Sequence, residues 1–417
     1  MTSQGQDAIT IMPPHAPLRG RAAPPGSKSI TNRALLLAAL ARGTSRLTGA
    51  LKSDDTRYMA EALRQMGVDI TEPDATSFTV TGSGRLLAPK GPLFLGNAGT
   101  ATRFLTAAVA MVEGEVVVTG DEHMQKRPIA PLIAALKALG VEIEAPTGCP
   151  PVTLRGKGGF SGQRMEIDGG LSSQYVSALL MLAAQGHAPV EVALTGQEIG
   201  AKGYIDLTLA AMRVFGAKAE VTGPGTWLVQ PGGYHAADWH IEPDASAATY
   251  FWAAEALSGG KIDLGVAAED FTQPDARSHA FMAQFPHMPA EIDGSQMQDA
   301  VPTLAVLAAF NETPVRFTGI ANLRVKECDR LSALATEMGK LGLAHEEGDE
   351  LVVTPRPGFA GQPVSLHTYA DHRMAMSLAL LGLRLEGVTI EDPGCVAKTF
   401  PEYWRVMGSL GLKTQAA

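Results

Sequence analysis

The densest group of charged side chains in the sequence lies at residues 322–330, Asn-Leu-Arg-Val-Lys-Glu-Cys-Asp-Arg. Its charged members are three cations and two carboxylates: Arg324, Lys326, Arg330, Glu327 and Asp329. The cations offer positive charge and N–H donors that suit carboxylate and phosphate oxygens, and the carboxylates can transfer protons or orient the cations. The pattern indicates an anion site. A solvated charged turn stays the alternative, because charged residues usually lie in water.

Polar turns of a second kind precede helix-like segments rich in alanine and leucine. Pro25-Gly-Ser-Lys-Ser29 opens a segment that runs to Arg42, Gly96-Asn-Ala-Gly-Thr100 precedes residues 101–112, and Gly169-Gly-Leu-Ser-Ser173 precedes residues 174–185. Free N–H groups and the helix dipole favour an anion at such a position, although each turn taken alone could equally be a helix cap. The first turn is not the P-loop of nucleotide kinases, which requires glycine where this chain has Ser27 and Ala22.

The polar turns recur along the chain. Their markers are Ser29, Thr100, Ser173, Asp244, Asp299 and His372, and successive markers are 71, 73, 71, 55 and 73 residues apart. Five glycines form a second series, each after a predicted helix and at a position that suits positive φ: Gly67, Gly140, Gly216, Gly342 and Gly411. The sequence therefore predicts six units, of which the fourth is short and lacks this glycine near residues 281–286.

Each unit mixes helices and strands. Second helices are predicted at residues 57–66, 128–139, 205–215, 331–341 and 403–410. Strand-like runs occur at residues 68–70, 116–119, 141–143 and 351–354. This pattern predicts an α/β protein with two domains of three units each, divided near residues 234–244.

Composition excludes several classes of function. The 417 residues are 45% hydrophobic and 6% aromatic and carry a net charge of −9, so we expect no nucleic acid and no membrane as partner. No apolar run reaches about 18 residues, and residues 1–14 lack a signal-peptide pattern, so we expect a soluble cytoplasmic protein. The three distant cysteines fit a reducing compartment, and no histidine spacing is typical of a metal site, so we expect no metal.

Seven motifs follow one another along the chain: Pro25-Gly-Ser-Lys-Ser-Ile-Thr-Asn-Arg33, Leu95-Gly-Asn-Ala-Gly-Thr-Ala-Thr-Arg103, Arg127-Pro-Ile129, Ser172-Ser-Gln174, residues 322–330, Asp371-His-Arg-Met-Ala-Met376 and Ala397-Lys-Thr-Phe-Pro401. Any one of them is unspecific. Together and in this order they resemble the 5-enolpyruvylshikimate-3-phosphate synthase family, over nearly the whole chain.

The resemblance implies a two-domain inside-out α/β barrel with six βαβαββ repeats, three per domain. Residues 25–241 would form the first domain and residues 1–24 with 242–417 the second, with the active site in the cleft between them. The implied activity transfers the enolpyruvyl group of phosphoenolpyruvate to the 5-hydroxyl of shikimate 3-phosphate and releases phosphate, in the shikimate pathway to chorismate and aromatic amino acids. Such an enzyme needs no cofactor, and we expect a monomer.

The same resemblance implies which residues bind the substrates. Phosphoenolpyruvate would be held by Lys28, Gly99, Arg127, Gln174, Arg330, Arg373 and Lys398. Shikimate 3-phosphate would be held by Lys28, Ser29, Arg33, Ser172, Ser173, Gln174, Asp299, Asn322 and Lys326. Asp299 would be the base for the attacking hydroxyl and Glu327 the acid for the methylene carbon, while Lys28 assists at the departing phosphate.

Two positions depart from the family's pattern. Ala201 stands three residues before Tyr204, where serine is usual, so one hydrogen bond to phosphate, worth about 1 to 3 kcal/mol, would be missing. Phe104 stands where many members have proline, after Arg103 and beside the glycine loop. The sequence therefore leaves sensitivity to the herbicide glyphosate open.

Two other functions stay as alternatives. The enolpyruvyl transferase that acts on UDP-N-acetylglucosamine shares the fold but typically carries a cysteine in a mobile loop, and residues 121–128 contain none. A non-catalytic module that binds phosphorylated metabolites could use the same repeat. The pair Asp299 and Glu327 favours an enzyme, because binding alone does not require it.

Overall fold

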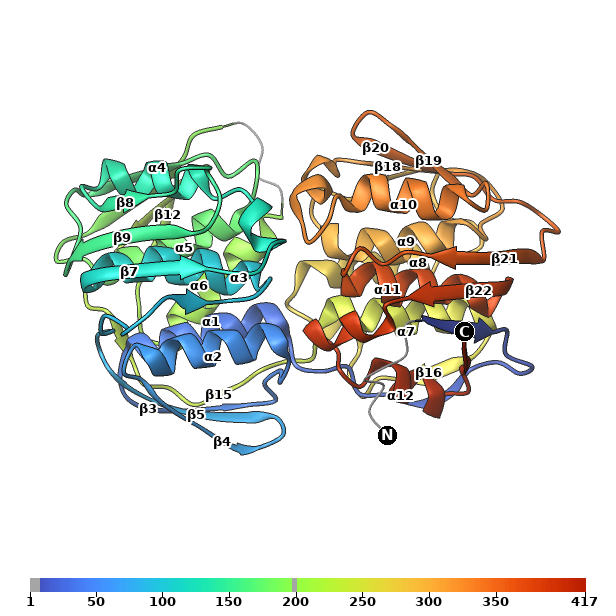
Figure 1. Cartoon of the computed structure of the whole chain (residues 1–417), viewed down its shortest axis with the longest axis horizontal. Helices are drawn as coiled ribbons and strands as arrows, with labels where there is room; N and C mark the ends of the chain where they lie inside the picture. The colour runs from blue at the N-terminus through green and yellow to red at the C-terminus, as the bar shows by residue number, and fades with distance from the viewer. Residues whose placement is uncertain (1–7, 197–200) are drawn as a thin grey trace. The chain divides into compact units, whose positions relative to one another are not determined.

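The computed structural model describes residues 8–196 and 201–417. The chain divides into two compact units (Figure 1). The central unit is Gly26–Glu242, and the terminal unit joins residues 8–25 to Pro243–Ala417. Each unit has a hydrophobic core of its own.

The helices of the central unit are of two kinds. The first helix of each repeat is buried on nearly every side, as expected of a helix that is apolar all round: α1 (Lys28–Leu40), α3 (Gly99–Ala108) and α5 (Ser173–Ala183). The second helix buries only part of its surface: α2 (Asp54–Gln65), α4 (Ala130–Ala138) and α6 (Gly203–Val214). Because α3 packs against both α1 and α5, small residues such as Ala107 and Ala108 let the buried helices approach closely.

Two sheets of the central unit are each made by one continuous βαβαββ segment. The first has the order β6-β7-β9-β8, from β6 (Leu93–Phe94), β7 (Glu113–Thr119), β8 (Glu142–Glu144) and β9 (Val152–Lys157). The second has the order β10-β11-β13-β12, from β10 (Arg164–Ile167), β11 (Val190–Leu194), β12 (Ala219–Gly223) and β13 (Thr226–Val229).

The third sheet of the central unit joins its two ends. Its order is β14-β3-β5-β4, with β15 also paired to β3, and its strands are β3 (Ala41–Thr48), β4 (Asp69–Asp74), β5 (Ser77–Ser83), β14 (Tyr234–His235) and β15 (Trp239–His240). The first repeat thus receives its parallel edge strands from the last residues of the unit.

The terminal unit repeats this plan. Its first helices are α7 (Ala245–Ser258), α9 (Val301–Ala308) and α11 (His372–Ala379), and its second helices are α8 (Ser278–Met282), α10 (Arg330–Gly339) and α12 (Tyr403–Ser409). One sheet has the order β17-β18-β20-β19, from β17 (Glu291–Asp293), β18 (Val315–Thr318), β19 (Ala344–Glu347) and β20 (Glu350–Val353).

The start of the chain completes the other two sheets of the terminal unit. Strand β1 (Ala8–Met12) lies between β22 (Glu386–Glu391) and β23 (Lys413–Ala416), antiparallel to both, and β21 (Gly361–Leu366) is the neighbour of β22. Figure 1 shows this dark blue strand among the red ones. Strand β2 (Arg19–Arg21) pairs only with β16 (Lys261–Asp263) in the described chain, so the fourth repeat has a two-stranded sheet. This small sheet accounts for the short fourth unit predicted from the sequence.

The predicted repeat markers are confirmed. Five of the six lie at or next to the start of a first helix, and Asp299 lies in the 3₁₀ helix Gln298–Ala300 that leads into α9. The five glycines all have positive φ, between 67° and 112°. Helix ends were less accurate: α1 ends at Leu40, not Arg42, because Ala41–Thr48 forms β3.

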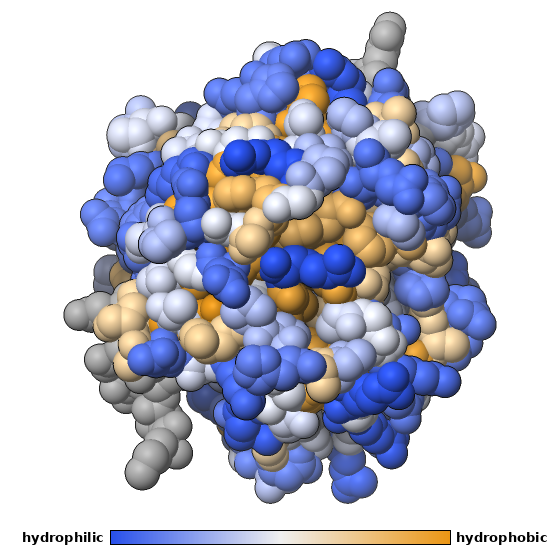
Figure 2. All heavy atoms as spheres, turned by 90° about the vertical axis from the view of Figure 1, so that its right-hand side faces the viewer, coloured by the Kyte–Doolittle hydropathy of each residue, from blue (hydrophilic) through white to orange (hydrophobic). Residues whose placement is uncertain are grey.

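The outer surface of the described chain is ordinary for a folded protein. Hydrophilic residues cover much of the face drawn in Figure 2, and hydrophobic residues gather near its middle. Large hydrophobic side chains that are exposed are spread along the chain: Met12, Leu87, Phe94, Val214 and Val221. Within residues 8–196 and 201–417, no helix has the length and apolar character needed to cross a membrane.

Candidate active site

Lys28 is the first residue of α1 and is nearly buried. Ser27 caps this helix, and its Oγ accepts a hydrogen bond from the N–H of Ile30 at 3.4 Å. The lysine side chain is 9% exposed, and its Nζ lies 3.6 Å from Oδ2 of Asp55, in the first turn of α2. A buried ammonium group is costly without a counter-charge, so Asp55 offsets that cost and fixes the lysine at the helix start.

Arg33 lies one turn further along α1, and neutral oxygens surround its guanidinium. The acceptors in the described chain are Ser29 O and Thr208 Oγ1, both at 2.8 Å, Tyr204 O at 3.1 Å and Ser177 Oγ at 3.2 Å. Burial lowers the pKa of Arg33 to about 10. The bond to Ser29 O means that Arg33 also holds the backbone of the serine predicted to bind substrate.

The two departures from the family's pattern are both buried. The Phe104 ring lies against the Arg33 guanidinium, with the carbon Cζ of the arginine 5.0 Å from the ring centroid, in cation–π geometry. Ala201, just before α6, has a φ of 58°, an unusual value for a residue with a Cβ. The structure therefore gives Phe104 a definite role in supporting Arg33.

The glycine loop and Arg127 form a second group in the central unit. Arg127 donates to Asn97 O at 3.3 Å and to Asn97 Oδ1 at 3.0 Å. A Cβ placed on Gly99 would lie 2.7 Å from Nη2 of Arg127. Because real Cβ atoms do not approach so closely, glycine at this position makes room for the guanidinium. Arg103 supports the loop by donating to Gly99 O at 3.2 Å.

The start of α5 meets the start of α3. Ser172 caps α5, with its Oγ accepting from the N–H of Gln174 at 3.2 Å, and Ser173 is the buried first residue of that helix. Gln174 Nε2 donates to Thr100 Oγ1 at 3.3 Å, beside Gly99. The structure thus brings Gln174 together with the glycine loop, although 74 residues separate the two in sequence.

In the terminal unit, Arg330 lies at the centre of three carboxylates. Its Nε donates to Asp371 Oδ2 at 2.8 Å, its Nη1 to Asp299 Oδ1 at 2.9 Å and its Nη2 to Glu327 Oε2 at 2.6 Å. The arginine side chain is 1% exposed. Burial opposes the charged form of Arg330, but the three carboxylates outweigh this effect and raise its pKa. The arginine therefore stays charged and fixes the positions of Asp299 and Glu327.

Three further cations surround the same carboxylates. Arg373 Nη2 donates to Asp299 Oδ2 at 3.0 Å, Lys326 Nζ lies 3.7 Å from Asp299 Oδ1, and Lys398 Nζ lies 3.8 Å from Glu327 Oε1. Burial opposes the charge on Arg373 as well, but the surrounding acidic groups, of which Asp299 has the largest effect, outweigh it and raise the pKa. Six of the seven site residues predicted in this unit thus form one charged cluster: Asp299, Lys326, Glu327, Arg330, Arg373 and Lys398.

The predicted anion segment divides into an inward and an outward part. Arg324 pairs with Asp329, Glu346 and Asp349 and is 29% exposed, so the alternative of a solvated charged turn is correct for this residue. Asn322, in the 3₁₀ helix Ala321–Val325, has a buried Oδ1 that makes no hydrogen bond in the described chain.

Sequence reasoning missed three supporting residues: Asp55, Asn97 and Asp371. Each contacts a predicted site residue far away in the chain: Asp55 is 27 positions from Lys28, Asn97 is 30 from Arg127, and Asp371 is 41 from Arg330. Asp371 carried one local signal, since it precedes a helix and caps it by accepting from the N–H of Arg373 at 2.8 Å. Its bond to Arg330 has no local signal.

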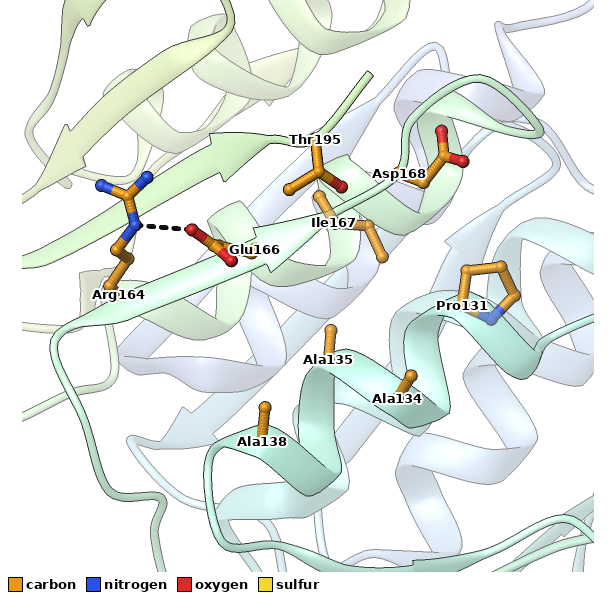
Figure 3. A pocket seen from close by; sticks show the side chains of 9 residues that line it. All are labelled: Pro131, Ala134, Ala135, Ala138, Arg164, Glu166, Ile167, Asp168 and Thr195. Atoms are coloured by element: carbon orange, nitrogen blue, oxygen red, sulfur yellow. Dashed lines mark hydrogen bonds and ion pairs between the residues drawn. The ribbon is translucent and has the colours of Figure 1, made fainter.

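No group of three or more His, Cys, Asp or Glu side chains in the described chain could hold a metal ion. A pocket between α4 and β10 is lined by Pro131, Ala134, Ala135, Ala138, Arg164, Glu166, Ile167, Asp168 and Thr195 (Figure 3). The alanines of α4 point toward β10, where Arg164 and Glu166 form an ion pair at 2.9 Å. None of the predicted site residues lines this pocket.

Comparison with known proteins identifies the family. The profile of EPSP synthase (3-phosphoshikimate 1-carboxyvinyltransferase) matches residues 12–407. The chain belongs to the EPSP synthase family. A 3-phosphoshikimate 1-carboxyvinyltransferase of Rhizobium etli is 68% identical over 411 residues, covering 98% of both chains. One from Pseudomonas syringae pv. syringae is 64% identical, covering 98% of this chain and 99% of the relative.

A solved structure supports the fold of an EPSP synthase. The EPSP synthase of Acinetobacter baumannii is 25% identical and superposes with a TM-score of 0.79, covering 98% of this chain and 99% of that one. The prediction of an inside-out α/β barrel built from βαβαββ repeats is therefore confirmed. The resemblance stated from the seven motifs is confirmed by the same comparisons.

Proposed function

We propose that both units supply residues for the reaction that this protein catalyses, the transfer of the enolpyruvyl group of phosphoenolpyruvate to the 5-hydroxyl of shikimate 3-phosphate with release of phosphate. The activity rests on membership in the family, whose relatives are 3-phosphoshikimate 1-carboxyvinyltransferases. It makes the protein a transferase of the shikimate pathway, which leads to chorismate and the aromatic amino acids.

The observation that carries the proposal is the cluster around Arg330. Two nearly buried carboxylates, Asp299 and Glu327, are both fixed by one buried arginine. A binding module gains little from such carboxylates when its ligands are anions. A transferase needs a base for the attacking hydroxyl and an acid for the methylene carbon, and these are the roles we assign to Asp299 and Glu327. Lys28 assists as phosphate departs.

The binding roles follow the charge of the substrates. Together they carry two phosphates and two carboxylates, which arginine and lysine bind well. We assign phosphoenolpyruvate to Lys28, Gly99, Arg127, Gln174, Arg330, Arg373 and Lys398. We assign shikimate 3-phosphate to Lys28, Ser29, Arg33, Ser172, Ser173, Gln174, Asp299, Asn322 and Lys326. The unbonded Oδ1 of Asn322 supports its part, because a substrate hydroxyl would satisfy it.

We further propose two domains with boundaries at residues 25–241 and at 1–24 with 242–417, each of three repeats. Separate hydrophobic cores support this division. The scattered exposed hydrophobic side chains support a monomer, since obligate interfaces are large and apolar. The three unpaired cysteines, Cys149, Cys328 and Cys395, support a cytoplasmic location. The reaction needs no cofactor.

Phosphate release tests this proposal. Purified protein is mixed with phosphoenolpyruvate and either shikimate 3-phosphate or UDP-N-acetylglucosamine. We expect release only with shikimate 3-phosphate. We expect Glu327→Gln to abolish it while both substrates still bind, and Asp299→Ala to abolish it as well. Release with UDP-N-acetylglucosamine would favour the other transferase. Binding without release would favour the non-catalytic module.

A further inference from the structure

The turn between β21 and α11 has an unusual backbone. Tyr369 has a φ of 57° and Ala370 a φ of 52°, and the N–H of Asp371 donates to Thr368 O at 2.9 Å. Positive φ at both central residues is the pattern of a type I′ turn, in which glycine, asparagine and aspartate dominate. Tyrosine and alanine adopt this conformation at a cost in free energy. Other contacts must therefore hold the turn.

Glu337 of α10 supplies these contacts. Its Oε1 accepts from the hydroxyl of Tyr369 at 2.8 Å, and its Oε2 accepts from the N–H of His367 at 2.9 Å. Lys340 donates to the same Oε2 at 2.6 Å. The carboxylate is 2% exposed, so it forms these bonds where water competes little. Glu337 thereby fixes the segment that leads into the turn.

The same helix also holds the end of the turn. Arg330 lies seven residues before Glu337, which places both on one face of α10. Arg330 donates to Asp371 through Nε at 2.8 Å and through Nη2 at 3.3 Å. Asp371 in turn caps α11 through the N–H of Arg373. Helix α10 therefore holds the turn from both sides, through Glu337 before it and Arg330 at its end. The residues that follow the turn, Asp371 and Arg373, belong to the charged cluster. Figure 1 shows α10 and α11 in the terminal unit.

We propose that Glu337 is a positioning residue, which fixes the turn at residues 368–371 and through it the placement of Arg330 and Arg373. It touches neither substrate. The inference rests on the proposed assignment of Arg330 and Arg373 to phosphoenolpyruvate. It predicts that loosening the turn weakens the use of phosphoenolpyruvate more than the use of shikimate 3-phosphate.

Two substitutions loosen the turn without large changes in volume. Glu337→Gln keeps the size but replaces one acceptor oxygen with an NH₂ group that faces a donor, and Tyr369→Phe removes one hydroxyl. We expect each to raise KM for phosphoenolpyruvate at least fivefold, with KM for shikimate 3-phosphate within twofold of wild type. Because the two substitutions act on one contact, between Tyr369 and Glu337, the loss in the double variant should be smaller than the sum of the two single losses.

A rescue and a control separate positioning from general destabilisation. Adding Ala370→Gly to Glu337→Gln should bring the raised KM for phosphoenolpyruvate part of the way back to the wild-type value, since glycine adopts positive φ without a Cβ penalty. Tyr234→Phe removes another buried hydroxyl, which donates to Met181 O at 2.7 Å in the central unit. We expect it to lower stability and leave both KM values unchanged.

The outcomes distinguish the inference from the assignment beneath it. If Arg373→Ala raises KM for phosphoenolpyruvate but Glu337→Gln and Tyr369→Phe do not, Glu337 has no positioning role. If Arg373→Ala has no effect, the assignment of Arg373 is wrong. In that case amide hydrogen exchange at residues 367–373 still tests whether Glu337 holds the turn. We expect faster exchange in Glu337→Gln, and unchanged exchange would overturn the claim.

Discussion

Replacing Arg330 with methionine should destabilise the terminal unit strongly, because it takes a buried cation away from three carboxylates. Arg330 is 1% exposed, and its contacts to Asp299, Glu327 and Asp371 measure 2.9, 2.6 and 2.8 Å. Without it, these carboxylates keep their negative charges close together and lose their common donor. Breaking a buried ion pair in this way costs about 3 to 5 kcal/mol.

The chain offers a matched control six residues away. Arg324 also contacts three carboxylates, those of Asp329, Glu346 and Asp349, at 3.0, 3.3 and 2.8 Å. Its side chain is 29% exposed, so water can replace the lost contacts. We expect Arg324→Met to cost only about 0 to 1 kcal/mol. The two substitutions are alike in chemistry and in the number of acidic partners, and they differ in burial.

The difference in stability between the two variants can be measured by amide hydrogen exchange at increasing urea concentration. Peptides from the terminal unit report its free energy of unfolding separately from that of the central unit, which matters because multidomain chains need not unfold in one step. We also expect Arg330→Met to lower kcat/KM by about a hundredfold or more, as loss of a preorganised donor does. Equal losses of stability in the two variants, within about 1 kcal/mol, would refute the argument from burial.

Three further predictions follow from single contacts. Gly99→Ala places a Cβ 2.7 Å from Nη2 of Arg127, so KM for phosphoenolpyruvate should rise about tenfold or more in steady-state assays; an unchanged KM would show that the loop yields freely. Phe104→Leu removes the ring whose centroid lies 5.0 Å from Arg33, a cation–π contact worth about 0.5 to 2 kcal/mol. It should raise KM for shikimate 3-phosphate up to about thirtyfold. A rise in KM for phosphoenolpyruvate alone would contradict this role. Burial and the hydrogen bond to Glu337 raise the pKa of Tyr369 to about 12, so the stability gained from its neutral form is present below pH 10 and lost as the pH rises through 12. The free energy of unfolding, measured at rising alkaline pH, should therefore fall less steeply in Tyr369→Phe than in the wild type. Identical curves would count against the raised pKa.

The sequence predicted those parts of the fold that depend on local backbone geometry. Helix ends at Gly67 or Gly140 were predictable, since a chain that turns into positive φ after a helix favours glycine. The spacing of the polar helix starts then revealed the repeat. The pairing of β1 with β22 and β23 was not predictable from local pattern, because it joins residues that lie between 379 and 407 positions apart.

The sequence allowed the site residues to be proposed, but it did not reveal how they are arranged. Residues 322–330 indicated anion binding, yet nothing in their order separates Arg324, which faces the β19–β20 hairpin, from Arg330, which is buried. That difference is set by Asp299, 31 residues earlier in the same repeat, and by Asp371, which comes from the next repeat. The turn at Tyr369 and Ala370 could not be predicted from the sequence either, because tyrosine and alanine rarely adopt positive φ.

The central claim is that Asp299 and Glu327 carry the acid–base chemistry, and solvent isotope incorporation tests it most directly. In D₂O, an acid that protonates the methylene carbon of phosphoenolpyruvate delivers deuterium, part of which remains when the enol ether re-forms. We predict deuterium in the methylene group of the product with wild-type protein. Glu327→Gln should bind both substrates and show neither incorporation nor product. Incorporation by Glu327→Gln at the wild-type rate would contradict the account.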